Sequence, residues 1–450
     1  MAKYQKYAEY KDSGVEWLGA IPGHWGVTQL KRLGKFITGM TPSTAVEAYY
    51  SDEITEYGWI RPEDILEESE KVEPTKFLTK LGWETQRTIP AQSTLICCIG
   101  TIGKLGFLGK RAVTNQQITA LVPDVRGFSK YYYYLLTASR NQLEHLATGN
   151  VVKILNSERL GSLWLPLLSS QNEARQIVHF LDYETAKIDH LIEKQQQLIE
   201  LLKEKRQAVI SHAVTKGLNP NVKMKDSGVE WLGEVPEHWV VKSYRLASRI
   251  YRGKFGHRPR NDPAFYDGDY PFIQTGDVAR AGKYITSYSQ TLNEKGKEVS
   301  QLFPKGTLMM AIAANIGDIA ILGFEAYAPD SVVGFKPNND IDLEFLRYSF
   351  IAALPALEQT STQSTQANLN VERIGAVKGT FPSLQEQREI VGYLDNLLEQ
   401  YRNLVKIAEN AIFLMQERRT ALISAAVTGK IDVRHWQSPT VAEAQTELSA

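Results

Sequence analysis

Cationic and amide side chains beside glycine-containing turns are the groups in this sequence best suited to ligand chemistry. The most basic loop is RGKFGHRPR, residues 252–260. Its candidate contact residues are Lys254, His257, Arg258 and Arg260. These donors can hold phosphate oxygens or hydrogen-bond to the edge of guanine. The loop therefore predicts a surface for a ligand that carries phosphates and bases.

A run of amides forms a second candidate site, earlier in the chain. Asn115, Gln116 and Gln117 follow a predicted pair of strands, and such amides can make paired hydrogen bonds to adenine. Gly100 and Gly103 would clear space for Lys104 to approach a phosphate. The further candidates are Thr41, Ser43, Arg61, Gln274, Thr275 and Asn315, with the polar segment TQSTQAN at 362–368. For each residue the alternative is an ordinary solvated loop.

The sequence contains no recognisable catalytic motif. Asn219-Pro220-Asn221 is a helix stop and not the Asn-Pro-Pro-Tyr element of adenine methyltransferases. The Gly103-Lys104 turn is not a phosphate-binding P-loop, because Leu105 stands where Ser or Thr is required. Cys97 and Cys98 are the only cysteines, and no further Cys or clustered His joins them as zinc ligands. We expect no catalytic residue, cofactor or metal on this chain.

Composition excludes little beyond secreted and membrane classes. Lys+Arg and Asp+Glu both total 51, so any basic surface must be local. Two adjacent cysteines rarely bridge, which indicates a reducing compartment. The N-terminus lacks the apolar core of a signal peptide, and no apolar run approaches the ~18 residues of a membrane helix. We expect a cytoplasmic protein.

The elements that must position these candidates are duplicated. KDSGVEWLGAIPGHW at 11–25 recurs as KDSGVEWLGEVPEHW at 225–239, a shift of 214 residues. LNSERLG at 155–161 recurs as LNVERIG at 369–375 with the same shift. Identity falls in the segments that hold the candidate loops, so we expect one architecture with two specificities. We interpret the repeated segment as an anchor, with His24 and His238 structural, and Tyr131–Tyr134 as core and not base-stacking residues.

Each half ends in a long segment with helical periodicity. Residues 170–216 lack Gly and Pro, and steps of four and three predict a seam of Ile177, Leu181, Glu184, Ile188, Leu191, Gln195, Leu198, Leu202, Lys205 and Val209. The second seam would be Ile390, Leu394, Leu397, Tyr401, Leu404, Ala408, Ala411, Met415, Arg418 and Leu422. Each narrow apolar stripe needs a partner, so we expect the helices to pair antiparallel and hold the two domains at opposite ends.

At this point the sequence strongly resembles the specificity subunit of type I restriction–modification enzymes. The residues that carry the resemblance are the doubled anchor, NEARQIVHFLD (172–182) with QEQREIVGYLD (385–395), and the GTIGK and NIGDI turns (100–104 and 315–319). The resemblance covers residues 10–431 and implies two mixed α/β target-recognition domains in an α+β chain, joined by an antiparallel coiled coil. The repeats, the composition and the helical periodicity predict an anchor at 1–25, the first recognition domain at 26–165, a spacer helix at 166–218, the repeated anchor at 219–239, the second recognition domain at 240–382, a second spacer helix at 383–431 and a flexible tail at 432–450.

The resemblance also implies partners. Each recognition domain would read one half of a split double-stranded DNA sequence. Two modification subunits would methylate adenine with S-adenosylmethionine, and restriction subunits would translocate and cut DNA with ATP and Mg²⁺. The chain itself would be non-catalytic. Two other hypotheses remain: a DNA-free coiled-coil adaptor, and a divergent methyltransferase or nuclease.

Overall fold

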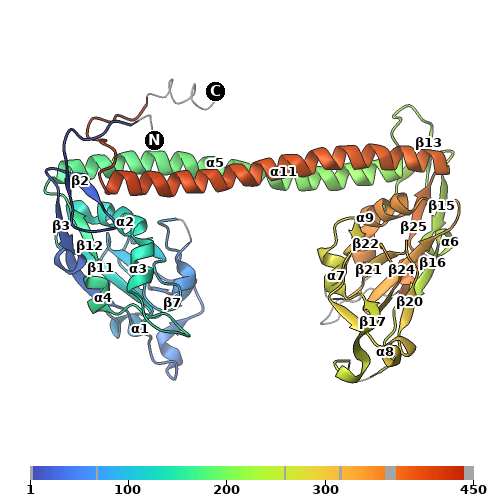
Figure 1. The fold of residues 1–450 in the computed structure, drawn as a ribbon, viewed down its shortest axis with the longest axis horizontal. Coiled ribbons are helices and arrows are strands. Elements are labelled where there is room, and N and C mark those ends of the chain that lie inside the picture. Colours follow the sequence, from blue (N-terminus) through green and yellow to red (C-terminus); the bar gives the residue numbers. More distant parts are fainter. Residues whose placement is uncertain (1–3, 67–68, 258–259, 314–316, 360–370, 440–450) are drawn as a thin grey trace. The chain divides into compact units, whose positions relative to one another are not determined.

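The computed structural model describes residues 4–66, 69–257, 260–313, 317–359 and 371–439. The chain forms two compact units, and each contains one copy of the repeat (Figure 1). Unit 1 comprises residues 1–195 and 410–450, and unit 2 comprises residues 196–409. The C-terminal part of the chain therefore completes the N-terminal unit. No helix among the described residues is both long and apolar enough to cross a membrane.

Unit 1 is built around two small sheets. The first has the order β4-β11-β8-β9, with every neighbouring pair antiparallel. Its strands are β4 (Gly34–Thr38), β11 (Ile118–Pro123), β8 (Thr94–Cys97) and β9 (Leu105–Phe107). The second has the order β10-β6-β7-β5, formed by β10 (Val113–Thr114), β6 (Gly58–Ile60), β7 (Lys76–Leu78) and β5 (Tyr50–Ser51).

The remaining strands of unit 1 form two antiparallel pairs. These are β1 (Tyr10–Asp12) with β2 (Ala20–Pro22), and β3 (Gly26–Gln29) with β12 (Trp164–Leu167). The short helices are α1 (Lys80–Glu84), α2 (Ser129–Ala138), α3 (Arg140–Leu146) and α4 (Ser157–Gly161). Residues Tyr131–Tyr134 of α2 are buried in the core of unit 1, which confirms their interpretation as core residues. The predicted pair of strands before the amide run is present as β8 and β9, which are joined by the glycine turn.

Unit 2 repeats this plan with one additional strand. Its larger sheet has the order β16-β24-β21-β22-β18, formed by β16 (Ser248–Arg252), β24 (Val332–Pro337), β21 (Leu308–Ala311), β22 (Ile319–Leu322) and β18 (Tyr284–Ile285). The second sheet has the order β19-β17-β23-β20, formed by β19 (Gln290–Leu292), β17 (Tyr266–Phe272), β23 (Ala326–Ala328) and β20 (Gln301–Phe303). The paired strands are β13 (Met224–Asp226) with β14 (Glu234–Pro236), and β15 (Val240–Ser243) with β25 (Lys378–Phe381).

The shorter helices of unit 2 are α6 (Tyr244–Ala247), α7 (Thr275–Arg280), α8 (Glu294–Glu298), α9 (Leu343–Gln359) and α10 (Val371–Ala376). In unit 2, α9 packs on the larger sheet, because Phe345 and Phe350 share a core with Leu308 and Phe335. The two long helices are α5 (Gln171–Lys216), with 46 residues, and α11 (Leu384–Val427), with 44 residues. Both of them contribute to both units.

The long helices pair antiparallel within each unit, as predicted. In unit 1, Ile177 near the start of α5 shares a core with Leu422 and Val427 near the end of α11. In unit 2, the reverse ends meet, because Val214 near the end of α5 shares a core with Ile390 near the start of α11. The apolar stripes thus bury each other and also cover the domain cores, which makes the helices part of both units.

The predicted seam is correct near the helix ends and at Ala408, and it fails at several other positions along the helices. Leu198 is 42% exposed whereas the next residue, Ile199, is 9% exposed. On α11, Leu398 is buried in place of Leu397, and Leu404 is 47% exposed. An α-helix advances 3.6 residues per turn, so a strict 3.5-residue pattern drifts off the buried face within a few turns. The predicted seam residues Lys205 and Arg418 are likewise exposed.

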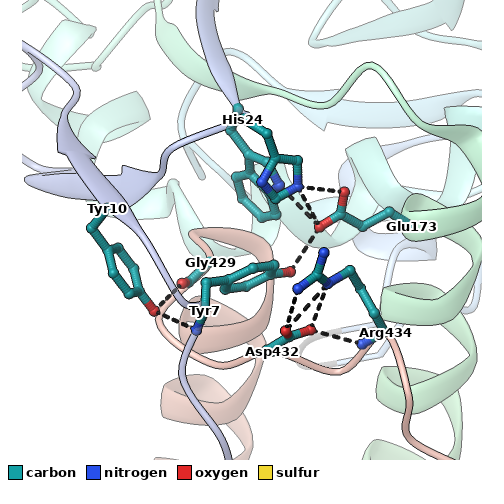
Figure 2. Close-up of polar contacts among 8 residues, drawn as sticks. Tyr7, Tyr10, His24, Glu173, Gly429, Asp432 and Arg434 are labelled. Atoms are coloured by element: carbon teal, nitrogen blue, oxygen red, sulfur yellow. Dashed lines mark hydrogen bonds and ion pairs between the residues drawn. The ribbon is translucent and has the colours of Figure 1, made fainter.

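A buried carboxylate holds the anchor of unit 1 (Figure 2). Glu173, in the first turn of α5, is 6% exposed. Its Oε1 accepts hydrogen bonds from Tyr7 Oη at 2.9 Å and Trp25 Nε1 at 3.0 Å, and its Oε2 lies 3.0 Å from His24 Nε2. Unit 2 repeats the arrangement around Glu386 with His238 at 3.0 Å and Trp239 at 3.1 Å. The histidines therefore have the structural role predicted for them.

A lysine at the end of each long helix donates hydrogen bonds to an anchor segment. Lys430, just after α11, donates to the carbonyl oxygens of Leu18 and Ala20 at 2.8 and 2.6 Å. Lys216, the last residue of α5, donates in the same way to the carbonyls of Leu232 and Glu234. Sequence repetition and structure therefore agree: each anchor fastens the first strands of a domain to the long helices.

Replacing Glu173 with alanine should destabilise the chain by about 3 kcal/mol, because three buried or half-buried donors lose their acceptor. Glu386→Ala is the matched control in the other copy. The Glu386 side chain is 28% exposed, so water can replace the lost contacts and we expect a loss of about 1 kcal/mol. Urea-induced unfolding of the full chain measures both, and equal losses would contradict this account of Glu173.

Candidate nucleic-acid interface

One end of the main sheet in unit 1 gathers most of the first-domain candidates. The strand register places Thr38 opposite Thr119, Ile118 opposite Cys97, and Ile96 opposite Leu105. The loops that follow β4, precede β11 and connect β8 to β9 therefore emerge at the same sheet end. They carry Thr41, Ser43, Lys104, Asn115, Gln116 and Gln117.

Hydrogen bonds organise this loop cluster. Asn115 Nδ2 donates to Gln117 Oε1 at 2.8 Å, and the Asn115 side-chain oxygen accepts from the Gln117 backbone at 3.1 Å. Thr41 hydrogen-bonds to Gln116, which is exposed together with Thr41 and Ser43. Asn115 is 7% exposed, so it orders the turn while its neighbours face solvent. The predicted amide cluster thus exists as a connected surface with free hydrogen-bonding capacity at its outer members.

A glycine brings the first loop against the amide turn. Gly39 donates its backbone N–H to Ile118 at 3.0 Å, and a Cβ at this position would lie 2.2 Å from the carbonyl oxygen of Thr114. Unit 2 has the same close approach: Gly253 donates to Val332 at 3.1 Å, and its Cβ would lie 1.9 Å from the carbonyl oxygen of Pro329. A side chain would push these loops apart, so glycine is required for their convergence.

Arg61 lies beside this cluster but already has partners. The Asn115 backbone donates to Ile60, the residue before Arg61, at 3.0 Å. Arg61 Nη1 lies 2.7 Å from Glu63, its Nη2 donates to Thr75 at 2.8 Å, and its Nε lies 3.6 Å from Asp64. These contacts hold the turn η3 (Pro62–Asp64). A base contact by Arg61 stays a prediction and would require exchange of one of these partners.

Two basic residues that the sequence did not single out also lie in this cluster. Gly100 donates to the carbonyl of Lys153 at 3.1 Å, so the exposed Lys153 lies beside the glycine turn that carries Lys104. Arg140 also packs there, with its Cγ 3.6 Å from the Cβ position of Gly103. The Nε of Arg140 has no hydrogen-bond partner among the described residues. Both residues are distant in sequence from the turn, so only long-range contacts reveal them.

The second domain presents the equivalent sheet end with different chemistry. Lys254 replaces Met40, and its backbone donates to Ala328 at 3.0 Å as Met40 does to Thr114 at 2.8 Å. Arg260 Nη2 lies 2.6 Å from Asp330, in the turn that replaces the amide run. The basic loop and the 329–331 turn therefore meet. At this turn the second domain has PDS (329–331) where the first has NQQ (115–117), so amides give way to an arginine–carboxylate pair.

His257, Gln274 and Thr275 are less accessible than Lys254. His257 lies 3.1 Å from Asp262 and stacks on Phe265 with a centroid distance of 4.0 Å. Gln274 caps α7 and donates through its side chain to Gln290 at 2.8 Å, and Thr275 is the first residue of that helix. Lys254 is exposed at the surface. Arg258, Asn315 and the 362–368 segment lie outside the described residues.

The described residues provide no evidence of a metal centre, since no group of three His, Cys, Asp or Glu side chains is placed to hold an ion. Cys97 and Cys98 are buried and unbridged, and burial raises the pKa of the Cys97 thiol to about 12. A thiol held neutral in this way is a poor nucleophile. The chemistry available at the sheet ends is hydrogen bonding and ion pairing, which suits recognition.

Comparison with known proteins assigns the chain to a family. It matches the family described as "Type I restriction modification DNA specificity domain" over residues 22–201 and again over residues 255–411. These ranges cover well over half of the chain. The chain belongs to the type I restriction–modification DNA specificity family. The resemblance expected from the repeated motifs is thereby confirmed, and the family domain occurs once in each half.

Curated relatives are specificity subunits of type I restriction enzymes. The MjaIX subunit of Methanocaldococcus jannaschii is 24% identical over 65% of this chain and 66% of its own length. The HindI subunit of Haemophilus influenzae is 30% identical over 30% of this chain and 29% of its length. The EcoBI subunit of Escherichia coli is 21% identical over 87% of this chain and 78% of its length. The match thus spans just under two thirds of the MjaIX subunit and less than a third of the HindI subunit.

Solved structures share the fold. A chain described under "complex assembly and conformational transition of the type I R-M system" matches with a TM-score of 0.69 and 14% identity, covering 90% of this chain and 98% of that chain. The HsdS subunit from Thermoanaerobacter tengcongensis matches with a TM-score of 0.50 and 14% identity, covering 91% and 98%. The predicted architecture of two mixed α/β domains with long paired helices is thus confirmed at the level of fold.

Lys153→Ala should weaken DNA binding about equally for all sequences, since a lysine at this edge would neutralise one backbone phosphate. The slope of log affinity against log salt should fall by about 1. Lys110→Ala is the matched control, because Lys110 is exposed beyond β9 at the opposite end of the same sheet. Titration of duplex DNA into the chain assembled with its modification partner, at several salt concentrations, tests this prediction. An equal effect of both variants would show that the DNA does not lie at this sheet end.

Proposed function

We propose that this chain reads a split, asymmetric DNA sequence, with one half contacted by each domain. The observation that supports this is the pair of equivalent sheet ends with different side chains: the amides 115–117, of which Gln116 is exposed, in unit 1, and Lys254 with the Arg260–Asp330 pair in unit 2. Amides and arginine read different base edges in the major groove, whereas lysines hold phosphates. A repeated framework with two different loop sets suits two different half-sites.

The partners follow from membership in the family and are proposed for this chain. They are double-stranded DNA, two modification subunits that methylate adenine with S-adenosylmethionine, and restriction subunits that use ATP and Mg²⁺. Exposed apolar side chains on the long helices in unit 2 support a protein partner. Leu198 and Leu201 of α5 are 42% and 61% exposed, and Leu404 and Ile407 of α11 are 47% and 65% exposed. Large apolar groups gathered on a helical surface are typical of an interface.

We propose further that the chain contributes recognition and assembly without catalysis. The cofactors would be bound by the partner subunits, and this chain would neither methylate nor cleave DNA alone. The hydrogen-bonding character of the loop clusters and the neutral, buried thiols are consistent with this role. A DNA target and reduced cysteines also suit a cytoplasmic location.

Exchanging residues 252–260 for a different loop should change one half of the recognised sequence and leave the other half intact. The reason is that this loop converges with the 329–331 turn in unit 2 and has no part in the unit 1 cluster. Mapping methylated adenines in cells that carry the chain with its modification partner reads both halves at once. The matched variant Gln116→Ala should alter the other half. A change in both halves, or in neither, would refute the assignment of one half-site to each domain.

Ile407→Asp should weaken association with the modification subunit by at least about tenfold, because it places a charge in an apolar surface that the partner would desolvate. The free energy of unfolding of the chain should change by less than about 0.5 kcal/mol in this variant, since the Ile407 side chain is largely exposed. Lys406→Asp is the control, adding the same acid at the adjacent exposed position. Co-purification and binding titration test this, and equal loss in both variants would indicate a general charge effect.

A further inference from the structure

A pocket in unit 2 has an unusual concentration of positive charge. It has a volume of about 290 Å³ and lies among α5, α9, α11 and the loop that follows α7. Four basic side chains line it: Arg206, Lys283, Arg347 and Arg402. Asp395 is the one acidic side chain among the described lining residues.

Arg347 is the deepest of these groups. It is 8% exposed, and its Nε has no hydrogen-bond partner among the described residues. Its guanidinium lies 5.4 Å from the centre of the Tyr348 ring. Burial lowers the pKa of Arg347, and the nearby charge of Arg206 lowers it further, although Tyr348 and the more distant carboxylates of Asp395 and Glu344 act in the opposite direction. A buried guanidinium that makes no direct ion pair is costly, so this position favours a bound anion.

The other basic residues differ in how far their charge is balanced. Lys283 is paired with Glu344 and with Asp395, the latter at 2.9 Å. Arg402 lies at the exposed edge of the pocket, 2.5 Å from Glu399, and its side chain is 70% exposed. Arg206 is exposed and makes no ion pair among the described residues. Arg206 and Arg347 therefore line the same space without a direct ion pair among the described residues, and Arg402 adds a third guanidinium there.

Unit 1 contains the equivalent pocket with balanced charge. It has a volume of about 270 Å³, and three basic and three acidic side chains line it. The shift of 214 residues places Tyr133 where unit 2 has Arg347. The long helices are related by a shift of 213 residues, so Asp189 corresponds to Arg402 and Arg206 corresponds to Arg419. Arg419 Nε donates to Asp189 at 3.0 Å, so the shared arginine is neutralised in unit 1. The positive charge of the unit 2 pocket is therefore not a requirement of the fold.

We propose that the unit 2 pocket binds a phosphate group held by Arg206, Arg347 and Arg402. Guanidinium groups donate paired hydrogen bonds that match phosphate oxygens, and a partly enclosed pocket strengthens such charged contacts. The phosphate could come from the DNA backbone or from free phosphate. The DNA source rests on the proposed function, whereas binding of free phosphate does not.

Calorimetric titration of the full chain with inorganic phosphate measures the phosphate affinity of the pocket. Arg402→Asp installs the acid found in unit 1 and should reduce phosphate affinity by at least about tenfold. Arg347→Met keeps an unbranched side chain that replaces the aliphatic part of the arginine, removes the buried charge and should have a similar effect, with circular dichroism to verify folding. Lys406→Asp makes the same charge change on α11 outside the pocket and should leave affinity within about twofold.

Titration of the complex with duplex DNA identifies the source. If the pocket holds a backbone phosphate, Arg402→Asp should weaken binding equally for the recognised and unrelated sequences and lower the salt slope by about 1. If DNA affinity is unchanged while phosphate affinity falls, the ligand is free phosphate. The proposal is overturned if Arg402→Asp and Arg347→Met alter neither titration, or if Lys406→Asp matches their effect. Failure of the proposed function is separate, because the wild-type complex would then show no sequence preference.

Discussion

The buried carboxylate of Glu173 is the interaction on which the arrangement of unit 1 depends. It joins the N-terminal segment through Tyr7, the anchor through His24 and Trp25, and the start of α5, which are far apart in the sequence. An ionised group this deeply buried is tolerated only because several donors surround it. Any shift of the anchor would leave the carboxylate unsatisfied, so the contact fixes where the first strands meet the long helices.

Glu386 makes the same contacts to histidine and tryptophan in unit 2. This repetition explains how the two domains share a framework and differ in the loops that would read DNA. Anchors, glycine close approaches and helix ends are shared because each satisfies a buried polar group or a tight backbone contact. The loops beyond those points are free to differ because they are exposed and their backbone is already held at both ends. Amides at 115–117 and the Arg260–Asp330 pair are two such outcomes on one framework.

The long helices show where a periodic pattern predicts packing and where it fails. Ile177, Leu181 and Ile390 are buried as their spacing indicated, because a domain core covers the helix ends. Leu198 and Leu404 are exposed, because the buried face rotates away from a strict heptad in the middle of each helix. The pattern alone also could not distinguish burial within the chain from burial against a partner, which is the role we propose for these exposed side chains.

The sequence by itself determined the duplication, the antiparallel pairing of the long helices and the family, because these follow from identity at fixed spacing and from helical periodicity. It also located the glycine turns and the loops that differ. Only the tertiary structure decided that Lys153 and Arg140 join the turn of Lys104, that Arg61 is engaged by Glu63 and Asp64, and that one of two equivalent pockets is strongly cationic. These facts depend on strand register and on contacts between distant segments, which leave no periodic trace in the sequence.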